Sequence, residues 1–167
     1  MGLRKKLRDS NFFQSIKEPN LLLSLDLVAL GTICDVVKLV DYNRNFVIKG
    51  LEIIKKRHNK GIAKIIDNSN INNQPTSGDL AFFIGPQLNA ASRIDNSSLP
   101  HKILISNNIE EIESIAKKLY LLNQKRKLIE DNIFSEALNE AEKQINQKFI
   151  LIYGSNWHNG VLGIIAS

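Results

Sequence analysis

Apolar residues near the start of the chain predict one buried helix followed by a less regular segment. The stretch "LLLSLDLVALG", residues 21–31, is apolar on every side of a helix, and Pro19-Asn20 before it is a typical helix start. Gly31 predicts the end of this helix, because glycine readily adopts the conformation that closes one. The following "TICDVVKLV", residues 32–40, predicts a turn or a short extended piece.

Two further helices and a polar loop follow in the pattern. Apolar and charged residues alternate at helical spacing in "YNRNFVIKGLEIIKKR", residues 42–57, which Asp41 can cap. "KGIAKIIDNS", residues 60–69, predicts a shorter helix, and the polar "NSNINNQPTSGD", residues 68–79, predicts a surface loop. An apolar segment and a compact polar cluster, "LAFFIGPQLNAASRIDNSS" (80–98), come next.

The longest periodic stretch runs from Ile109 to Gln147 without Gly or Pro. Its apolar residues step by three or four, with one gap of seven: Ile112, Ala116, Leu119, Leu122, Ile129, Ile133, Ala137, Ala141 and Ile145. A helix of this length exceeds the usual globular helix, so we expect it to bridge two domains. "KFILIYGS", residues 148–155, then predicts a buried strand, which indicates an α/β protein.

Both ends of the chain lack the signals that close an element. Residues 2–13, "GLRKKLRDSNFF", resemble the tail of a helix, and "NWHNGVLGIIAS", residues 156–167, opens a turn into a helix whose apolar pattern continues to Ser167. We therefore expect both ends to be cut from a longer protein.

The composition narrows the class of protein. The net charge of +5 suits nucleic-acid binding. Alternatively, the excess of lysine reflects AT-rich coding DNA, which would also explain why the chain is rich in Asn and Ile. The one cysteine, Cys34, excludes an internal disulfide and suits a reducing cytoplasm. No run approaches the roughly 18 apolar residues of a membrane span, and no apolar signal follows the basic start. We expect a cytoplasmic protein without membrane contact.

The apolar stretch "LDLVALGTICDVV", residues 25–37, carries Asp26 and Asp35. Burying a carboxylate is costly unless it is paired, hydrogen-bonded or bound to a metal. At the end of an element Asp35 can face a cleft as a ligand for Mg²⁺ or Mn²⁺, or it can cap a helix and accept backbone amides. Cys34 beside it suits a small buried residue rather than a reactive thiol.

The stretch "GPQLNAASRI" (85–94) gathers groups suited to a phosphate. Gly85 opens it, Asn89 offers both donors and an acceptor, and Arg93 carries the guanidinium fork that binds phosphate in two places. The alternative is a loop that hydrogen-bonds itself, with Arg93 in a surface ion pair.

A third stretch, "WHNGVLGIIAS" (157–167), places His158 ahead of Gly160, so the backbone can approach a ligand or a neighbouring element closely. A helix beginning there could point amides at a phosphate. The alternative is close packing of a strand and a helix, with His158 hydrogen-bonded in the interface. His58 and His101 have no partner at metal-ligand spacing and suit structural or solvated roles.

These three stretches, with a long helix between the last two, resemble the RecJ-type single-strand-specific DNA exonucleases of the DHH phosphoesterase superfamily. The resemblance covers nearly the whole chain. It implies an α/β fold in three parts: the C-terminal part of a DHH-type parallel-sheet domain in residues 1–106, an inter-domain connecting helix in 107–147, and the start of a DHHA1-type α/β domain in 148–167.

The resemblance also implies the roles of individual residues. Asp35 matches an aspartate that ligates a catalytic metal, Mn²⁺ or Mg²⁺, which would account for a carboxylate in an apolar setting. Asp26 has no such match, and we expect it either to support the metal ligands from behind or to be structural. Asn89 and Arg93 match a polar cluster beside the scissile phosphate, where Arg93 would offset developing charge. The matching mechanism is two-metal hydrolysis that releases nucleotides from the 5′ end of single-stranded DNA, in DNA repair and recombination.

The remaining matches concern substrate binding. Gly85 belongs to the same cluster as Asn89, and His158 with Gly160 matches the opening of the DHHA1-type domain, which would close over the strand. Smaller departures from the family pattern are Gln87, where a basic residue is frequent, and Ser92, where glycine is usual.

The Asp-His-His triplet that names the superfamily is absent from the chain, as are the earlier aspartate motifs that supply most metal ligands. A lone carboxylate does not hold two metals, so we predict that the chain alone is not an active nuclease. Two alternatives follow: a subunit of a split enzyme whose separately encoded N-terminal DHH half supplies the ligands, or a non-catalytic nucleic-acid-binding remnant.

Overall fold

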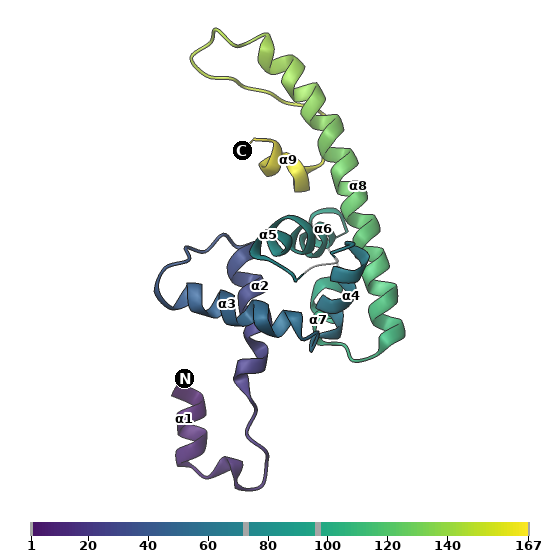
Figure 1. Cartoon of the computed structure of the whole chain (residues 1–167). Coiled ribbons are helices and arrows are strands. Elements are labelled where there is room, and N and C mark those ends of the chain that lie inside the picture. The colour runs from purple at the N-terminus through teal and green to yellow at the C-terminus, as the bar shows by residue number, and fades with distance from the viewer. Residues whose placement is uncertain (1, 72–73, 96–97, 167) are drawn as a thin grey trace.

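The computed structural model describes residues 2–71, 74–95 and 98–166, and these residues form helices joined by turns and loops (Figure 1). In chain order the elements are α1 (Gly2–Asp9), η1 (Phe12–Gln14), η2 (Leu21–Ser24), α2 (Leu25–Cys34), α3 (Asp41–Lys55), α4 (Lys60–Asn68), α5 (Ser77–Asp79), η3 (Leu80–Ile84), α6 (Gly85–Ile94), α7 (Leu99–Ile105), α8 (Ile109–Glu142) and α9 (Asn159–Ile165). Of these, η3 is a π-helical turn that leads directly into α6.

The helices α2, α3, α4, α6 and α7 gather around the first half of α8 (Figure 1). A core of aliphatic side chains from these helices and from η3 joins them. Its fully buried members include Ile62, Ile65, Leu80, Ile84 and Leu119. Burial of such side chains supplies most of the driving force for folding, so this part of the chain is a stable platform.

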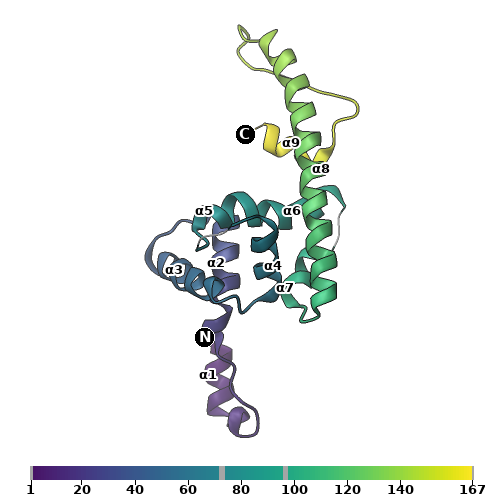
Figure 2. The same ribbon diagram turned by 45° about the vertical axis from the view of Figure 1, so that its right-hand side comes forward.

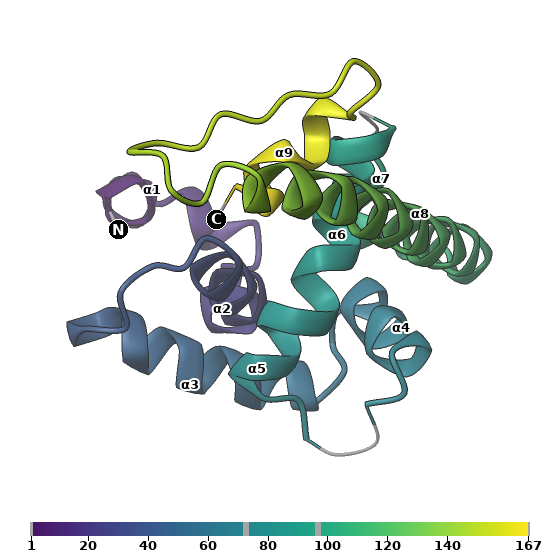
Figure 3. The same ribbon diagram turned by 90° about the horizontal axis from the view of Figure 1, so that it is seen from above.

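Helix α8 extends well beyond this platform (Figures 1 and 2). Its 34 residues correspond to a length of about 51 Å. Helix α8 contacts α4, α6 and α7. Its core residues all lie in its first half, and its second half extends away from the core (Figure 1). Seen from above, α9 lies beside α8 and over α6, and it contacts both helices (Figure 3). The predicted long helix is confirmed from Ile109 to Glu142, short of the expected end at Gln147, and it joins the core to the last segment of the chain.

The strand predicted for residues 148–155 is wrong for this structure, and none of the residues it describes forms a sheet. The N–H and C=O of Leu151 instead bond to the side-chain amide of Gln144, at 3.1 and 3.0 Å. A strand needs a neighbouring strand to pair its backbone groups. The parallel sheet of the expected α/β fold is therefore not confirmed.

Three local expectations also differ from the structure. Gly31 does not end the helix, because α2 continues to Cys34 and turns only where Val36 adopts a positive φ of 53°. Asp41 is the first residue of α3 and makes no cap, since Val40 precedes it as the N-cap. The stretch 85–94 is helix α6, so the alternative interpretation of it as a loop is wrong.

The loop predicted for residues 68–79 lies between α4 and α5, with residues 72 and 73 outside the described part. It ends in a capping box, in which Thr76 and Asp79 each accept the other's backbone N–H. The polar cluster predicted at 80–98 likewise includes residues 96 and 97, which are not described. Among the described residues, no helix is long and apolar enough to cross a membrane.

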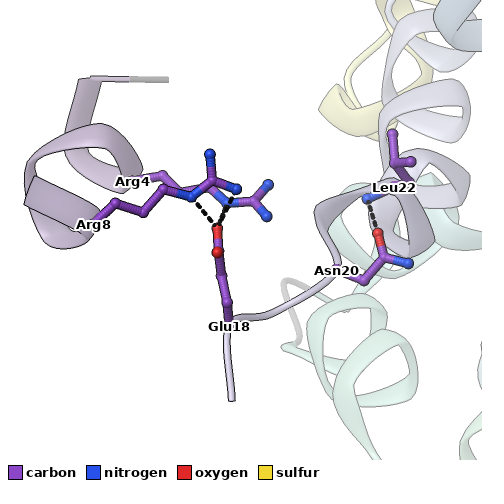
Figure 4. Close-up of polar contacts among 5 residues, drawn as sticks. All are labelled: Arg4, Arg8, Glu18, Asn20 and Leu22. Atoms are coloured by element: carbon purple, nitrogen blue, oxygen red, sulfur yellow. Dashed lines mark hydrogen bonds and ion pairs between the residues drawn. The ribbon is translucent and has the colours of Figure 1, made fainter. Parts of the chain in front are cut away.

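The N-terminal helix α1 stands apart from the core in Figures 1 and 2 and contains no buried residue. Arg4 and Arg8 both donate to the carboxylate of Glu18, the Arg8 bond being 2.8 Å long, and this holds α1 against the segment that follows it (Figure 4). Asn20 then caps η2 by accepting the Leu22 N–H at 3.1 Å, which confirms the predicted helix start.

Candidate functional site

A small cleft of about 170 Å³ opens where the end of α2, the start of α6, the middle of α8 and the end of α9 come together. Its lining consists of Cys34, Ala81, Gly85, Pro86, Asn89, Arg93, Arg126 and Ile164. A larger hollow of about 600 Å³ lies between the second half of α8, residues 150–154 and α9, but no charged side chain lines it. Of these two, the smaller cleft is the one with charged side chains for an ionic ligand.

Helix α6 supplies most of the polar groups in this cleft. Pro86, Asn89 and Arg93 are spaced by three and four residues, so they share one face of the helix. The opposite face buries Leu88 and Ala91 in the core. Because this buried face fixes how α6 sits, Asn89 and Arg93 are held toward the cleft by packing rather than by loop geometry.

Arg93 joins α6 to α9. Its Nη1 donates to the carbonyl of Gly160 at 3.0 Å. A Cβ on Gly160 would lie 2.2 Å from the carbonyl oxygen of Arg93, so only glycine permits this approach. The alternative of a surface ion pair for Arg93 is wrong, since no carboxylate of the described residues pairs with it.

Gly85 allows a second close approach, between α6 and α2. A Cβ there would lie 2.6 Å from the Sγ of Cys34. The structure thus brings Gly85, Asn89 and Arg93 into one cleft and places Gly160 in contact with Arg93.

His158 lies at the N-cap of α9 and not in the lining of the cleft. Its Nδ1 accepts the N–H of Gly160 at 3.1 Å, and its side chain is exposed. His158 therefore makes a local cap with an exposed side chain, and the alternative of a hydrogen bond in an interface between a strand and a helix is wrong for this structure. Gly160, two residues further on, makes the contact with Arg93.

Asp35 follows the last residue of α2, beside the cleft wall formed by Cys34. Its backbone N–H donates to the carbonyl of Gly31 at 3.0 Å, but within the described chain its carboxylate accepts no hydrogen bond, so it is no side-chain cap. The side chain is exposed rather than buried. The expectation that Asp35 is buried and needs a cation for that reason is wrong.

Asp26 is the carboxylate that α2 buries. It is only 4% exposed, and it accepts the Leu27 N–H at 2.7 Å. Burial raises the pKa of Asp26, because water no longer stabilises the charged form. It does not line the cleft, which agrees with a structural role.

Burial also raises the pKa of the Cys34 thiol, and the negative charge of Asp35 raises it further. The thiol therefore stays protonated at neutral pH. It forms part of the cleft wall and is not an activated nucleophile.

Arg126 of α8 is a residue of the cleft that the sequence analysis missed. It lies within the seven-residue gap in the apolar pattern of the long helix, between Leu122 and Ile129. Asn123, also in this gap, is buried. Two polar residues at positions where the helical period predicts apolar ones were the signal that could have found this part of the site.

A metal would need several ligands close together. Across residues 2–71, 74–95 and 98–166, no three side chains of His, Cys, Asp or Glu are grouped to hold one. These residues alone therefore do not fit a metal centre, and Asp35 could provide only a single carboxylate to one.

No protein-family model matches the chain. It is 41% identical to a single-stranded-DNA-specific exonuclease RecJ of Haemophilus influenzae and 40% identical to that of Escherichia coli, in each case along its whole length. It is 30% identical over 142 residues to the exonuclease of Thermus thermophilus. The chain spans 30% of the length of the first two relatives.

Solved structures give the same result. The crystal structure of RecJ with Mn²⁺ from Thermus thermophilus matches 92% of the chain with a TM-score of 0.82 and 28% identity, and the chain covers 23% of it. A structure of exonuclease RecJ bound to manganese matches with a TM-score of 0.81, and the chain covers 39% of that structure. These likenesses support a DHH/DHHA1-type architecture.

Proposed function

We propose that this chain, which belongs to the RecJ-type family of single-stranded-DNA-specific exonucleases, forms one wall of a nuclease cleft and binds the phosphate at which the strand is cut. The activity that we propose for the complete enzyme is the stepwise hydrolysis of single-stranded DNA in the 5′ to 3′ direction. The observation that carries the proposal is the meeting of Asn89 and Arg93 with the end of α2 in one cleft.

The side chains of α6 bind and orient the phosphate. Arg93 uses one nitrogen for Gly160 and keeps its other N–H groups for an oxyanion. Asn89 is exposed at the same face and can donate from its amide. Arginine bonds to phosphate are charge-assisted, and they strengthen as negative charge grows in the transition state. Gly85 and Gly160 matter because larger residues would push α2 and α9 away from α6.

Asp35 is proposed as one ligand of a divalent cation, Mn²⁺ or Mg²⁺, whose other ligands come from outside the described residues. Two such cations, when bound, would supply an activated water and stabilise negative charge on the phosphate. Asp35 suits this role because its carboxylate is exposed next to the cleft and has no competing hydrogen bond within the described chain. His158 is proposed to support substrate binding by orienting Gly160.

The division into parts is proposed as residues 1–106 for the end of the catalytic domain, 107–147 for the connecting helix and 148–167 for the start of the second domain. The packing of α8 supports it, since the α8 residues that belong to the core, between Ile112 and Leu122, all lie in its first half.

The first test measures binding and cleavage separately. A 5′-phosphorylated, 3′-labelled single strand is incubated with the chain and Mn²⁺. We expect salt-dependent binding without degradation by the chain alone, and binding about tenfold weaker in Arg93→Gln. Cleavage by the parent chain that is lost in Asp35→Ala would overturn the prediction of inactivity. Binding by Arg93→Gln as tight as that of the parent chain would overturn the proposed site.

A second candidate function is binding without cleavage, either as a subunit of a split enzyme or as a non-catalytic remnant. The lack of a grouped metal-ligand set among the described residues favours it. Adding a separately produced half that carries an Asp-His-His triplet distinguishes the two: restored cleavage supports the subunit, and unchanged binding without cleavage supports the remnant.

A further inference from the structure

The cleft contains a second guanidinium, on a different helix from Arg93. Arg126 lies in the middle of α8 and lines the same cleft as Asn89 and Arg93. Its side chain is only 12% exposed. The lining residues include no carboxylate, so two cationic groups face one small space without an anion among its walls.

Neighbours on α8 hold the Arg126 side chain in one orientation. Its Nε donates to Oδ1 of Asn123 at 3.1 Å, and its Nη1 donates to Oε2 of Glu130 at 2.5 Å. Asn123 is itself buried. A guanidinium has five N–H donors, and within the described chain none of the hydrogen bonds of Arg126 uses its Nη2. The fork is therefore oriented and retains donors.

We infer that Arg126 is a second phosphate-binding residue of this cleft, which holds an oxygen of the same phosphate group that Arg93 contacts. The inference rests on the proposed function of the cleft. Two guanidinium groups repel each other across a small space, and a phosphate between them removes this repulsion while pairing with both. Glu130 offsets part of the charge of Arg126 while the cleft holds no phosphate.

Arg93 and Arg126 lie on different helices, so a phosphate bound by both would link these helices. Arg93 belongs to the core through α6, and Arg126 belongs to the helix that leads to the last segment of the chain. A phosphate bound by both residues therefore ties α6 to α8 at the level where α9 also contacts them.

The test uses the full chain and a fluorescein-labelled oligothymidylate, with binding followed by anisotropy over a range of salt concentrations. Arg126→Gln is expected to bind about tenfold more weakly, with a salt slope smaller by about 0.7. Lys127→Ala is the matched control, because Lys127 is the next residue, is exposed and does not line the cleft. We expect its binding to change by less than about twofold.

Glu130→Gln separates a ligand contact from a merely structural ion pair. If Arg126 binds phosphate, removal of the competing carboxylate tightens binding, by about two- to fivefold. If Arg126 only holds α8 together, this variant binds no better than the parent, which would overturn the inference. The same variant decides the matter should Arg126→Gln fail to fold.

The outcomes distinguish this inference from the proposed function. Weakened binding in Arg93→Gln but not in Arg126→Gln overturns the role of Arg126 and leaves the cleft assignment standing. Unchanged binding in both variants, or no binding by the parent chain, overturns the cleft assignment and the inference together.

Discussion

Arg93 and Gly160 meet where α6 and α9 touch: the Arg93 guanidinium donates to the Gly160 carbonyl at 3.0 Å, and the Arg93 carbonyl lies where a Cβ of residue 160 would be. The two residues are 67 positions apart in the chain. Their contact seats α9 beside the cleft, and it occupies one nitrogen of the residue proposed to bind phosphate.

Gly160→Ala is expected to displace α9, because the new methyl group would meet backbone 2.2 Å away. If α9 stays in place, we expect the free energy of unfolding to fall by about 1–3 kcal/mol. If α9 detaches, we expect residues 159–165 to lose their protection from hydrogen exchange. Gly163→Ala is the matched control, since no atom lies within 4 Å of its added Cβ. It should be neutral or stabilising, by up to about 1 kcal/mol. Equal behaviour of the two variants would contradict the packing described.

Cys34 should react slowly with a thiol reagent, because its pKa is raised by burial and by Asp35. The thiolate, which is the reactive form, then appears only at higher pH than in the unfolded chain. Asp35→Asn removes the negative charge that contributes to the raised pKa of Cys34, so the labelling rate should begin to rise at a lower pH. The measurement is the rate of labelling against pH, with the urea-unfolded chain as reference.

The same labelling reports on the cleft. Because Cys34 lines it, a bound oligonucleotide should slow labelling of the parent chain but not of Arg93→Gln at the same concentration. Protection that is equal in both would mean that the strand binds elsewhere.

Asp26→Asn is expected to raise the melting temperature at pH 7. The pKa of Asp26 is higher in the folded chain than in the unfolded chain. The neutral carboxyl group therefore contributes fully to stability below the unfolded-state pKa, and this contribution is lost as the pH rises through the folded-state pKa. At neutral pH the buried charge destabilises the fold, and asparagine removes it while keeping an acceptor for the Leu27 N–H. Thermal melts at pH 3 and pH 7 test this, and the benefit should shrink at the lower pH.

Glu18→Gln should release α1 without unfolding the core. The hydrogen bond from Arg8 lowers the pKa of Glu18, so the contact is present above the ordinary glutamate pKa and is lost as pH falls through the lowered value. Since α1 buries no residue, we expect faster proteolysis at residues 2–18 but an unchanged melting temperature. Asp9→Asn is the control, because Asp9 forms no ion pair in the described chain. A large drop in melting temperature for Glu18→Gln would show that α1 supports the core.

Much of the local structure could be read from the sequence, because helices depend on spacings of three and four residues. The periodic stretch from Ile109 predicts α8, and residues 60–69 predict α4. The polar cluster around Asn89 and Arg93 predicts a site, since such residues in an apolar region need a reason.

Packing alone decided the rest. Whether residues 148–155 form a strand depends on a partner that no local pattern supplies, and the exposure of Asp35 depends on how α2 meets α6. Arg126 joins Asn89 and Arg93 only because α8 crosses α6 at that point. The sequence by itself determined the long helix α8, the shorter helix α4, the family and the residue types of the cleft. The tertiary structure decided which of those side chains meet, because contacts between distant segments depend on how whole helices pack and not on neighbours in the chain.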